Sequence, residues 1–390
     1  MKTISILGST GSIGCSALDV IKLHPGKFNI FALSGYQNVD LLLTQALEFN
    51  PKYIVTKDEK SQLLLQKLLK EKQLNIEVLF GADGYRFIAG HKKVSTVLAA
   101  ISGAAGLVST FEAAKKGKQI LLANKESMVM AGSLLSKACS KNNGFIIPVD
   151  SEHNAIFQVI HNQNNPNEIN KLILTASGGP FRNYSLNELK NVSIEDALNH
   201  PNWTMGKKVT IDSATMMNKG LEVIEAAFLF KIDYKNIEVL IHPQSIVHSL
   251  VEFIDGSSLT QLGTPDMKVP ISYALSYPER ISSGVSGINL ALNEDLQFEV
   301  PDLEKFRCLK LAYECLEKGG SYPIEINATN EIAVEAFLNS KIKFTQIAEI
   351  IEIALNQADN STIETIEDIL EVDKLARIKA KNLLEGQKFA

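Results

Sequence analysis

The feature that most constrains the fold is a glycine-spaced loop close to the N-terminus. The apolar, β-branched run Thr3–Leu7 leads into residues 8–14, which read Gly-Ser-Thr-Gly-Ser-Ile-Gly, and a helical pattern then extends from about Ser12 to His24. Glycines between a strand and a helix permit a tight turn and let a pyrophosphate approach the amides at the helix N-terminus. This context predicts a dinucleotide site, the alternative being a purely structural turn.

Short β-rich runs continue to alternate with helical patterns as far as Val149. Further strands are expected at Phe28–Leu33, Tyr53–Thr56, Val94–Ala100, Gln119–Leu122 and Phe145–Val149, with helices at segments such as Leu41–Phe49 and Ser61–Leu69. Such alternation is typical of a parallel sheet covered by helices. We therefore predict a Rossmann-like, doubly wound nucleotide-binding domain over residues 1–149.

The pattern changes from residue 150 onwards. Strands of a more antiparallel type are expected at Lys171–Thr175, Ile237–Ile241, Ile246–Ile254 and Leu259–Leu262, with a helix at about Asn218–Phe230. Residues 282–301 have few periodic apolar positions and are interpreted as a linker. Four helical patterns follow at Leu303–Lys318, Ala328–Asn339, Phe344–Asn356 and Ile363–Leu384. The predicted fold class is α/β, with a central α/β domain at 150–281 and a C-terminal helical bundle at 302–390.

Charge and cysteine usage exclude several classes of protein. The 390 residues include 39 basic and 44 acidic side chains, for a formal net charge of −5, which argues against a dedicated nucleic-acid binder. No run reaches the roughly 18 apolar residues of a membrane span. The four cysteines are scattered, with no metal-ligand spacing. Since no signal-peptide pattern opens the sequence, we expect a cytoplasmic protein with reduced thiols.

The end of the second predicted strand bears on the choice of cofactor. NAD-dependent enzymes usually place an Asp or Glu here to bind the adenosine ribose. Residues 34–38 instead read Ser-Gly-Tyr-Gln-Asn, with no carboxylate before Asp40 and no Lys or Arg. The missing acid favours NADPH, with Gly35, Gln37 and Asn38 as candidate contacts. The neutral loop also suits an ordinary surface turn.

Two carboxylates follow the last strand of the predicted parallel sheet. Asp150 and Glu152 stand at alternate positions, which an extended backbone turns to one side. Ligands collect at the carboxyl ends of parallel strands, and oxygen ligands suit Mg²⁺ or Mn²⁺. The alternative is a solvated loop that caps the next helix.

A second polar segment spans residues 210–222. Asn218 and Glu222 are four residues apart and share a helical face, with Lys219 beside them. Together with the hydroxyl of Ser213, these groups suit a phosphate, and Glu222 suits a metal. A surface ion pair between Lys219 and Glu222 is the other reading.

The only tryptophan of the chain lies in a loop between these segments. Residues 200–206 read His-Pro-Asn-Trp-Thr-Met-Gly, so Trp203 stands among proline, glycine and asparagine. Such a loop suits a lid that closes on a ligand, with His200 as a phosphate donor or proton carrier. A loop pinned by one aromatic side chain is the structural alternative.

Taken together, these segments resemble the 1-deoxy-D-xylulose 5-phosphate reductoisomerase family over essentially the whole chain. Six motifs carry the resemblance in order, at residues 8–14, 123–127, 148–153, 175–181, 200–206 and 212–222. The resemblance departs at Tyr36-Gln37, where many members carry Lys or Ser before the Asn, and at Lys268, where Arg is common.

The resemblance implies roles for individual residues. It implies metal ligands at Asp150, Glu152 and Glu222. It implies substrate contacts at Lys125, Ser151, Ser177, His200, Ser213, Asn218 and Lys219, with Trp203 covering the substrate. It implies cofactor contacts at Thr10, Gly11, Ser12, Ile13, Asn124, Glu126 and Gly206, in a chain with a mobile lid at about 177–207.

The implied activity belongs to the non-mevalonate isoprenoid pathway. It is the NADPH- and divalent-metal-dependent rearrangement and reduction of 1-deoxy-D-xylulose 5-phosphate to 2-C-methyl-D-erythritol 4-phosphate, by a homodimer that needs neither nucleic acid nor a membrane. Lys125, His153 and metal-bound water remain alternatives for the group that moves protons. A metal-independent semialdehyde or hydroxy-acid dehydrogenase and a non-enzymatic NADPH sensor are the competing classes.

Overall fold

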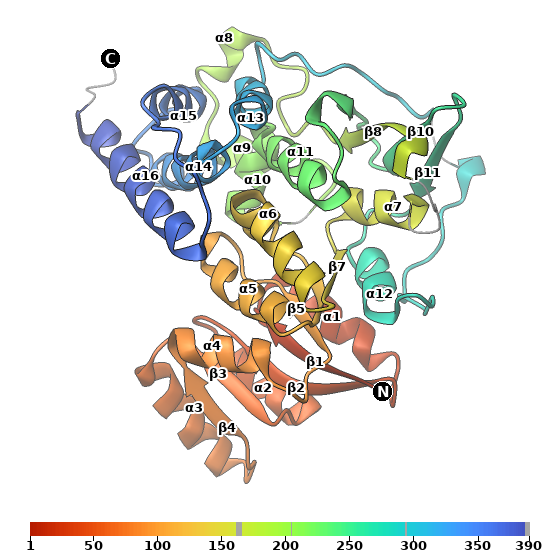
Figure 1. The fold of residues 1–390 in the computed structure, drawn as a ribbon, viewed down its shortest axis with the longest axis vertical. Coiled ribbons are helices and arrows are strands. Elements are labelled where there is room, and N and C mark those ends of the chain that lie inside the picture. Colours follow the sequence, from red (N-terminus) through yellow and green to blue (C-terminus); the bar gives the residue numbers. More distant parts are fainter. Residues whose placement is uncertain (161–165, 204, 293–294, 387–390) are drawn as a thin grey trace. The chain divides into compact units, whose positions relative to one another are not determined.

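The computed structural model describes residues 1–160, 166–203, 205–292 and 295–386 (Figure 1). The chain divides into two compact units. The first unit contains Met1–Ser127, Leu135–Asn154 and Asp266–Ser286, and the second contains Met128–Leu134, Ala155–Pro265 and Gly287–Ala390.

A seven-stranded parallel sheet forms the centre of the first unit. Its strands are β1 (Lys2–Leu7), β2 (Phe28–Ser34), β3 (Tyr53–Thr56), β4 (Glu77–Phe80), β5 (Thr96–Ala99), β6 (Gln119–Leu122) and β7 (Phe145–Pro148). Their order is β4-β3-β2-β1-β5-β6-β7. The winding direction therefore reverses between β1 and β5, and the crevice at such a reversal is where open α/β sheets bind ligands.

Helices connect these strands. They are α1 (Ser12–Lys22), α2 (Val39–Phe49), α3 (Glu59–Glu71), α4 (Gly81–Gly90) and α5 (Leu107–Lys115), with a 3₁₀ turn η1 (Ala104–Gly106). The predicted Rossmann-like sheet is confirmed. Strand β4 was not predicted, because it is a four-residue edge strand with only Val78 buried.

Two helices carry residues of both units. Helix α6 (Lys125–Lys141) is kinked at Ala131, where φ is −130° and ψ is 20°, and α7 spans Ser151–Ile160. A Cβ atom on Gly132 would lie 2.3 Å from the ring of Phe228, so α6 packs closely there within the second unit. Only a glycine permits this approach.

The second unit contains a mixed four-stranded sheet. Its strands are β8 (Ile169–Ala176), β9 (Ile237–Ile241), β10 (Val247–Phe253) and β11 (Ser258–Leu262), in the order β11-β10-β8-β9. Strand β10 runs antiparallel to both β8 and β11, whereas β8 and β9 are parallel. The expected antiparallel character therefore holds for β10 with both of its neighbours, whereas the parallel pairing of β8 with β9 was not predicted.

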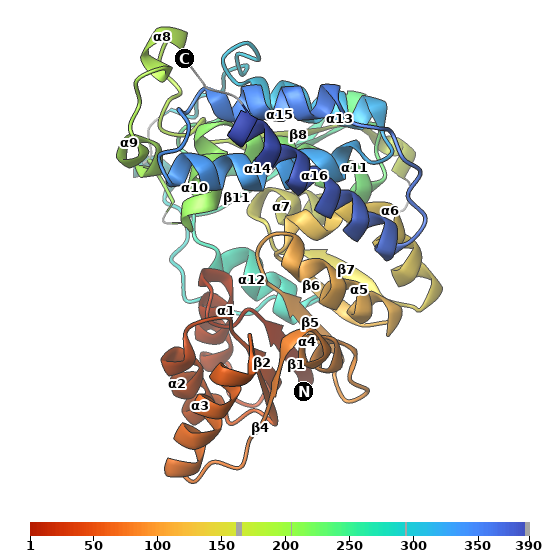
Figure 2. The same cartoon turned by 90° about the vertical axis from the view of Figure 1, so that its left-hand side faces the viewer.

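Helices make up the rest of the second unit. They are α8 (Leu186–Leu189), α9 (Ile194–Leu198), α10 (Lys207–Ala214), α11 (Met217–Phe230), α13 (Arg307–Lys318), α14 (Tyr322–Leu338), α15 (Gln346–Asn356) and α16 (Ile366–Gly386), with 3₁₀ turns η2 (Pro166–Glu168), η3 (Tyr234–Asn236) and η4 (Leu290–Leu292). Helix α14 packs against both α15 and α16 (Figure 2). Buried side chains such as Leu221, Ala312 and Phe337 form a common core of α11, α13 and α14. The predicted helical C-terminal part is therefore present.

The division by contacts differs from the contiguous boundaries expected from the sequence. Helix α12 (Lys268–Ser276), within the predicted domain 150–281, belongs to the first unit and packs against α1. The Lys2 ammonium also donates to the backbone carbonyls of Leu275 and Tyr277. Contacts between segments some 250 residues apart leave no local pattern in the sequence. In the described part of the predicted linker, η4 and a bridge between Ile241 and Glu299 are present.

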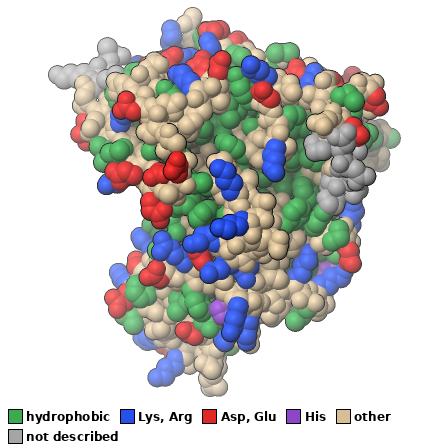
Figure 3. Space-filling view, in the orientation of Figure 1, with side chains coloured by type: hydrophobic (Ala, Val, Ile, Leu, Met, Phe, Trp, Pro, Cys, Tyr) green, Lys and Arg blue, Asp and Glu red, His purple; other side chains and the backbone are tan. Residues whose placement is uncertain are grey.

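The surface bears both signs of charge, and side chains of both signs are present on the face in Figure 3. Among the described residues, no helix combines the length and apolar character needed to cross a membrane.

Candidate active site

The glycine loop is built by close backbone packing. Gly8 has a φ of 84°, and a Cβ there would lie 2.5 Å from the carbonyl oxygen of Ala100. A Cβ on Gly14 would lie 2.4 Å from the carbonyl oxygen of Gly8. Neither position accepts a side chain without moving the loop.

Gly11 meets a different requirement. It is exposed, and a Cβ there would meet nothing closer than the Gly8 carbonyl oxygen at 3.4 Å. As N-cap of α1 it supplies no side-chain cap to the first amides of that helix. These amides suit an anion, which favours a dinucleotide pyrophosphate over a purely structural turn. Thr10, Ser12 and Ile13 flank Gly11 in the same loop.

The loop after β2 packs beside the glycine loop. The backbone N–H of Ser9 donates to the Ser34 carbonyl at 2.7 Å, and a Cβ on Gly35 would lie 3.0 Å from the side chain of Thr10. Gln37 and Asn38 are both exposed, and Asn38 caps α2 by accepting from the N–H of Leu41. Asn38 therefore has a structural role in addition to its predicted one.

Asn124 and Glu126 lie at the end of β6, on the opposite side of the winding reversal. Asn124 caps α6 and donates to Glu126 at 2.9 Å and to the Gly103 carbonyl at 3.0 Å. The loop after β5, where Gly103 has a φ of 73°, was not among the predicted site segments. The sequence feature that could have marked this loop is a glycine three residues after the predicted strand Val94–Ala100.

The acidic segment after β7 forms a charged cluster in the first unit. The Lys125 ammonium lies 2.9 Å from Asp150 Oδ2, and His153 Nδ1 lies 3.3 Å from Asp150 Oδ1. Ser151 donates to Glu152 Oε2 at 2.5 Å. Asp150 and Glu152 are half-buried, so this segment is not a freely solvated loop, but Asp150 Oδ1 also accepts the backbone N–H of Glu152 at 3.3 Å at the start of α7, as the capping alternative predicts.

A histidine lies between two serines in the second unit. His200 Nε2 is 3.0 Å from Ser177 Oγ, at the end of β8, and 3.0 Å from Ser213 Oγ, on α10. The turn that places Ser177 requires Gly179, since a Cβ there would lie 2.7 Å from the Ser213 carbonyl. Residues from three segments thus meet at one imidazole.

The charge state of His200 follows from its contacts. Its Nδ1 accepts the backbone N–H groups of Asn202 at 3.2 Å and Trp203 at 3.0 Å, so Nδ1 carries no proton. Burial lowers the pKa of His200 to about 4. The neutral ring therefore carries its proton on Nε2, which makes Nε2 a donor toward Ser177, Ser213 or a bound anion.

The first turns of α11 carry a buried polar cluster. Asn218 donates to Glu222 Oε1 at 2.5 Å, and Lys219 forms an ion pair with Glu222 Oε2. Lys219 is 3% exposed and Glu222 is 1% exposed. The alternative of a surface ion pair is therefore wrong, because these charges are buried. Met216, the N-cap residue that precedes α11, has a φ of 60°, an uncommon conformation for a residue other than glycine.

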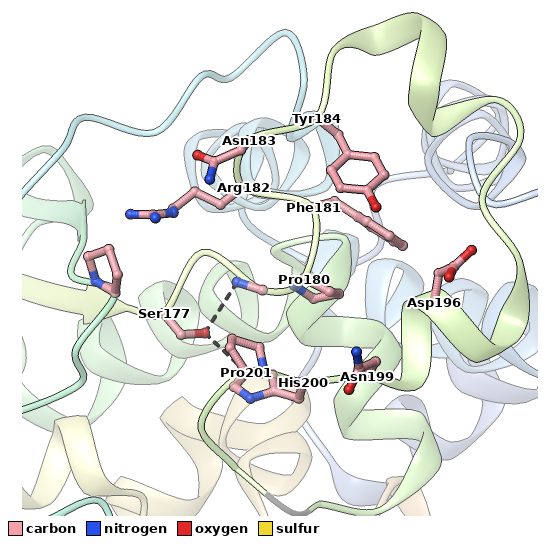
Figure 4. A pocket seen from close by; sticks show the side chains of 12 residues that line it. Ser177, Pro180, Phe181, Arg182, Asn183, Tyr184, Asp196, Asn199, His200 and Pro201 are labelled. Carbon is pink, nitrogen blue, oxygen red and sulfur yellow. Dashed lines mark hydrogen bonds between the residues drawn. The ribbon is translucent and has the colours of Figure 1, made fainter.

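A pocket of about 410 Å³ opens beside Ser177 and His200, which point toward one another (Figure 4). Its other lining residues include Arg182, Asn183 and Tyr184, none of which was a predicted site residue. They directly follow the Gly-Gly-Pro-Phe motif, and this position next to a predicted site motif is the sequence feature that could have identified them. Arg182 also lies 3.1 Å from Glu299.

The predicted site residues thus gather into clusters within each unit. The first unit contains the glycine loop, the loop after β2, Asn124 with Glu126, and the Lys125–Asp150 cluster. The second unit contains the His200 and Glu222 clusters, half-buried Trp203 and Gly206, the N-cap of α10.

Family models match most of the chain. The model of 1-deoxy-D-xylulose 5-phosphate reductoisomerase matches residues 4–132. The models of its C-terminal domain match residues 146–230 and 262–379.

Similar proteins extend over nearly the full length. The 1-deoxy-D-xylulose 5-phosphate reductoisomerase of Thermodesulfovibrio yellowstonii is 52% identical over 381 residues, covering 98% of this chain and 99% of that protein. The reductoisomerase of Cellvibrio japonicus is 48% identical, covering 98% of each.

Solved structures show the same fold. A DOX-P reductoisomerase in complex with NADPH, fosmidomycin and magnesium matches with a TM-score of 0.93 at 48% identity, covering 99% of this chain and 98% of that one. The Zymomonas mobilis enzyme in complex with NADPH matches with a TM-score of 0.93 at 43% identity, covering 99% and 100%. On these grounds the chain belongs to the 1-deoxy-D-xylulose 5-phosphate reductoisomerase family.

Proposed function

We propose that this chain catalyses the NADPH- and divalent-metal-dependent conversion of 1-deoxy-D-xylulose 5-phosphate to 2-C-methyl-D-erythritol 4-phosphate in isoprenoid biosynthesis. The observation that carries the proposal is the neutral, half-buried His200 held between Ser177 and Ser213. The cluster offers imidazole and hydroxyl donors to an anionic group, such as the phosphate of the proposed substrate.

The glycine loop fits the adenine dinucleotide. Gly8 and Gly14 close the loop, and Gly11 leaves the first amides of α1 accessible to a pyrophosphate. Asn124, Glu126 and Gly206 complete the proposed cofactor contacts. NADPH bound there supplies the hydride that reduces the rearranged skeleton.

Asp150, Glu152 and Glu222 fit a divalent metal by their chemistry. All three donors are carboxylate oxygens, which hard ions such as Mg²⁺ and Mn²⁺ prefer. A bound ion supplies Lewis-acid polarisation of the substrate's hydroxyl and carbonyl oxygens. Lys125, 2.9 Å from Asp150, balances and orients that carboxylate, and Asn218 and Lys219 do the same for Glu222.

The remaining residues bind and shield the substrate. His200, Ser177, Ser213, Asn218 and Lys219 donate to its phosphate, while Ser151 contacts the reacting end. Anchoring a remote phosphate holds the reacting carbons in place and helps to close the lid at about 177–207. Trp203 covers the substrate and excludes water.

The relatives support the choice of ligands. The similar solved proteins were crystallised with NADPH, with magnesium and with fosmidomycin. We assign the first two to the corresponding sites of this chain. We also retain the division of roles into a cofactor part (1–149), a catalytic part (150–281), a linker (282–301) and a helical part (302–390).

We further propose a homodimer. Strand β11 ends the sheet of the second unit and pairs with β10 on one side. Ile254, Leu259 and Leu262, in and before this strand, are 69%, 48% and 38% exposed. An apolar sheet edge is a pairing surface, and a second copy of the chain would cover it.

The proposal places the enzyme in the cytoplasm. All four cysteines are free thiols, and burial raises the pKa of Cys139 to about 11 and of Cys308 to about 12. Such unreactive, buried thiols suit a reducing compartment.

The test is NADPH oxidation with 1-deoxy-D-xylulose 5-phosphate, with Mg²⁺ or Mn²⁺ and after removal of metal with EDTA. Metal-dependent oxidation is expected. Activity that survives EDTA would point to a simple dehydrogenase, and NADPH binding without turnover would point to a sensor.

A further inference from the structure

The loop after β2 has no basic residue of its own, yet a lysine from the next strand lies beside it. Residues 35–38 read Gly-Tyr-Gln-Asn. The ammonium of Lys57, the residue that follows β3, lies 4.6 Å from the centre of the Tyr36 ring. A cation is therefore present where the local sequence shows none.

The sheet explains this placement. Strands β2 and β3 are parallel, with Ser34 paired to Val55, and the Gly35 N–H donates to the Val55 carbonyl at 3.1 Å. Tyr36 and Lys57 each stand two residues beyond that pair. Both side chains thus arise at the carboxyl edge of the sheet, where open α/β sheets bind their ligands.

The ammonium of Lys57 is in no ion pair among the described residues, although the neighbouring Asp58 carboxylate attracts it electrostatically. Over the described ranges 1–160, 166–203, 205–292 and 295–386, no carboxylate lies within ion-pair distance of its ammonium. Its neighbour Asp58 is engaged as the N-cap of α3, accepting from the N–H of Ser61 at 2.9 Å. Lys57 is exposed and Tyr36 is 59% exposed, so both are accessible to a ligand.

Contacts with the rest of the first unit fix the backbone of the loop after β2. Tyr85 donates to the Gly35 carbonyl at 3.0 Å, and residue 35 packs against Thr10 of the glycine loop. The surface beyond Gly35 is where the adenosine ribose of a dinucleotide on the glycine loop is expected.

We propose that Lys57, oriented by the ring of Tyr36, is the residue that selects NADPH over NADH by binding the 2′-phosphate. This inference rests on the proposed NADPH site. The positive charge that Tyr36 and Gln37 do not supply would then come from Lys57, about twenty residues further along the chain. A lysine ammonium can bind a phosphate as a single point charge, without the bidentate hydrogen bonds that arginine forms.

The test is direct binding to the full-length protein. Dissociation constants are measured for NADPH and NADH, and for 2′,5′-ADP and ADP as probes without redox chemistry. Removing one charged phosphate contact in Lys57→Ala should weaken NADPH and 2′,5′-ADP about tenfold and leave NADH and ADP within about twofold. Lys57→Arg should retain most of the preference.

A matched control lies at the other end of the same strand. Lys52 is exposed, precedes β3 and lies 5.3 Å from the centre of the Tyr53 ring, so Lys52→Ala removes the same kind of contact at the opposite edge of the sheet. It should leave all four dissociation constants unchanged. Thermal unfolding of both variants identifies any general loss of stability.

The outcomes separate this inference from the proposed function. If the unmodified protein binds neither nucleotide, the proposed function fails. If it prefers NADPH and Lys57→Ala keeps that preference, or weakens NADPH and NADH equally, the role of Lys57 is refuted.

Discussion

The N–H of Trp203 donates to Nδ1 of His200 at 3.0 Å, so the single tryptophan is coupled through one loop to the histidine that lies between Ser177 and Ser213. Because Nδ1 is occupied by this bond, the Nε2 proton must face Ser177 and Ser213. The hydrogen bond that fixes the conformation of the Trp203 loop therefore also fixes the direction in which His200 Nε2 donates.

This coupling predicts a pH dependence of stability. The pKa of His200 is lowered to about 4 by burial, below its ordinary value near 6.5, so the unfolded chain takes up a proton that the folded chain does not. The contribution of His200 is complete above pH 6.5 and is lost as the pH falls toward 4. His200→Asn keeps an acceptor for the loop amides but does not titrate. Thermal unfolding from pH 7 to 4 should therefore destabilise the unmodified protein more than this variant, and parallel curves would contradict the assignment.

Replacing Trp203, which lies in the proposed lid, should affect catalysis more than folding. Trp203 is half-buried in a loop, and Trp203→Ala is expected to lower kcat roughly tenfold while the melting temperature stays nearly unchanged. Steady-state kinetics and thermal unfolding measure the two effects, with Trp203→Phe as the conservative control. Loss of stability without a specific kinetic defect would instead assign Trp203 a packing role.

The buried carboxylate of α11 should be essential for turnover. Glu222→Gln keeps the size of the side chain but removes a charge from the proposed metal ligands, and kcat should fall by about a thousandfold or more. NADPH affinity should stay within about twofold, since the cofactor contacts are elsewhere. Glu238→Gln, an exposed position on β9, is the matched control. Full activity of Glu222→Gln at ordinary Mg²⁺ concentrations would remove Glu222 from the metal site.

Two alanine substitutions should separate the structural and binding roles of the glycine loop. At Gly14 the new Cβ would lie 2.4 Å from the Gly8 carbonyl, so Gly14→Ala should cost about 1–3 kcal/mol of stability. At Gly11 the nearest atom is 3.4 Å away, so Gly11→Ala should fold normally and weaken NADPH about tenfold or more through its methyl group. Thermal unfolding and nucleotide titration measure both variants. An unchanged affinity in Gly11→Ala would move the pyrophosphate away from this loop.

Much of the fold could be predicted from the sequence because its signals are local. The predicted elements that are present each have a sequence pattern no longer than one strand or one helix. Examples are the strand, glycine loop and helix at residues 2–22, the strand Gln119–Leu122 and the C-terminal helices. The glycine at position 14 likewise reflects local contacts with residues 8 and 9, whereas Gly8 is also required by its approach to the carbonyl of the distant Ala100. Steric requirements of a tight turn and hydrophobic periodicity depend on residues that are close together in the sequence, so both can be recognised without the structure.

Other features depend on contacts between distant segments, and only the tertiary structure decides them. Helix α12 joins the first unit through α1, and the burial of Lys219 and Glu222 excludes the surface ion pair that their spacing alone allows. The placement of Lys57 beside Tyr36 depends on the pairing of β2 with β3. Which nitrogen of His200 carries the proton depends on the two backbone N–H groups of its own loop that donate to Nδ1. The residue types were visible in the sequence. Their charge states and partners were not, because desolvation and hydrogen bonding depend on which segments the folded chain brings together.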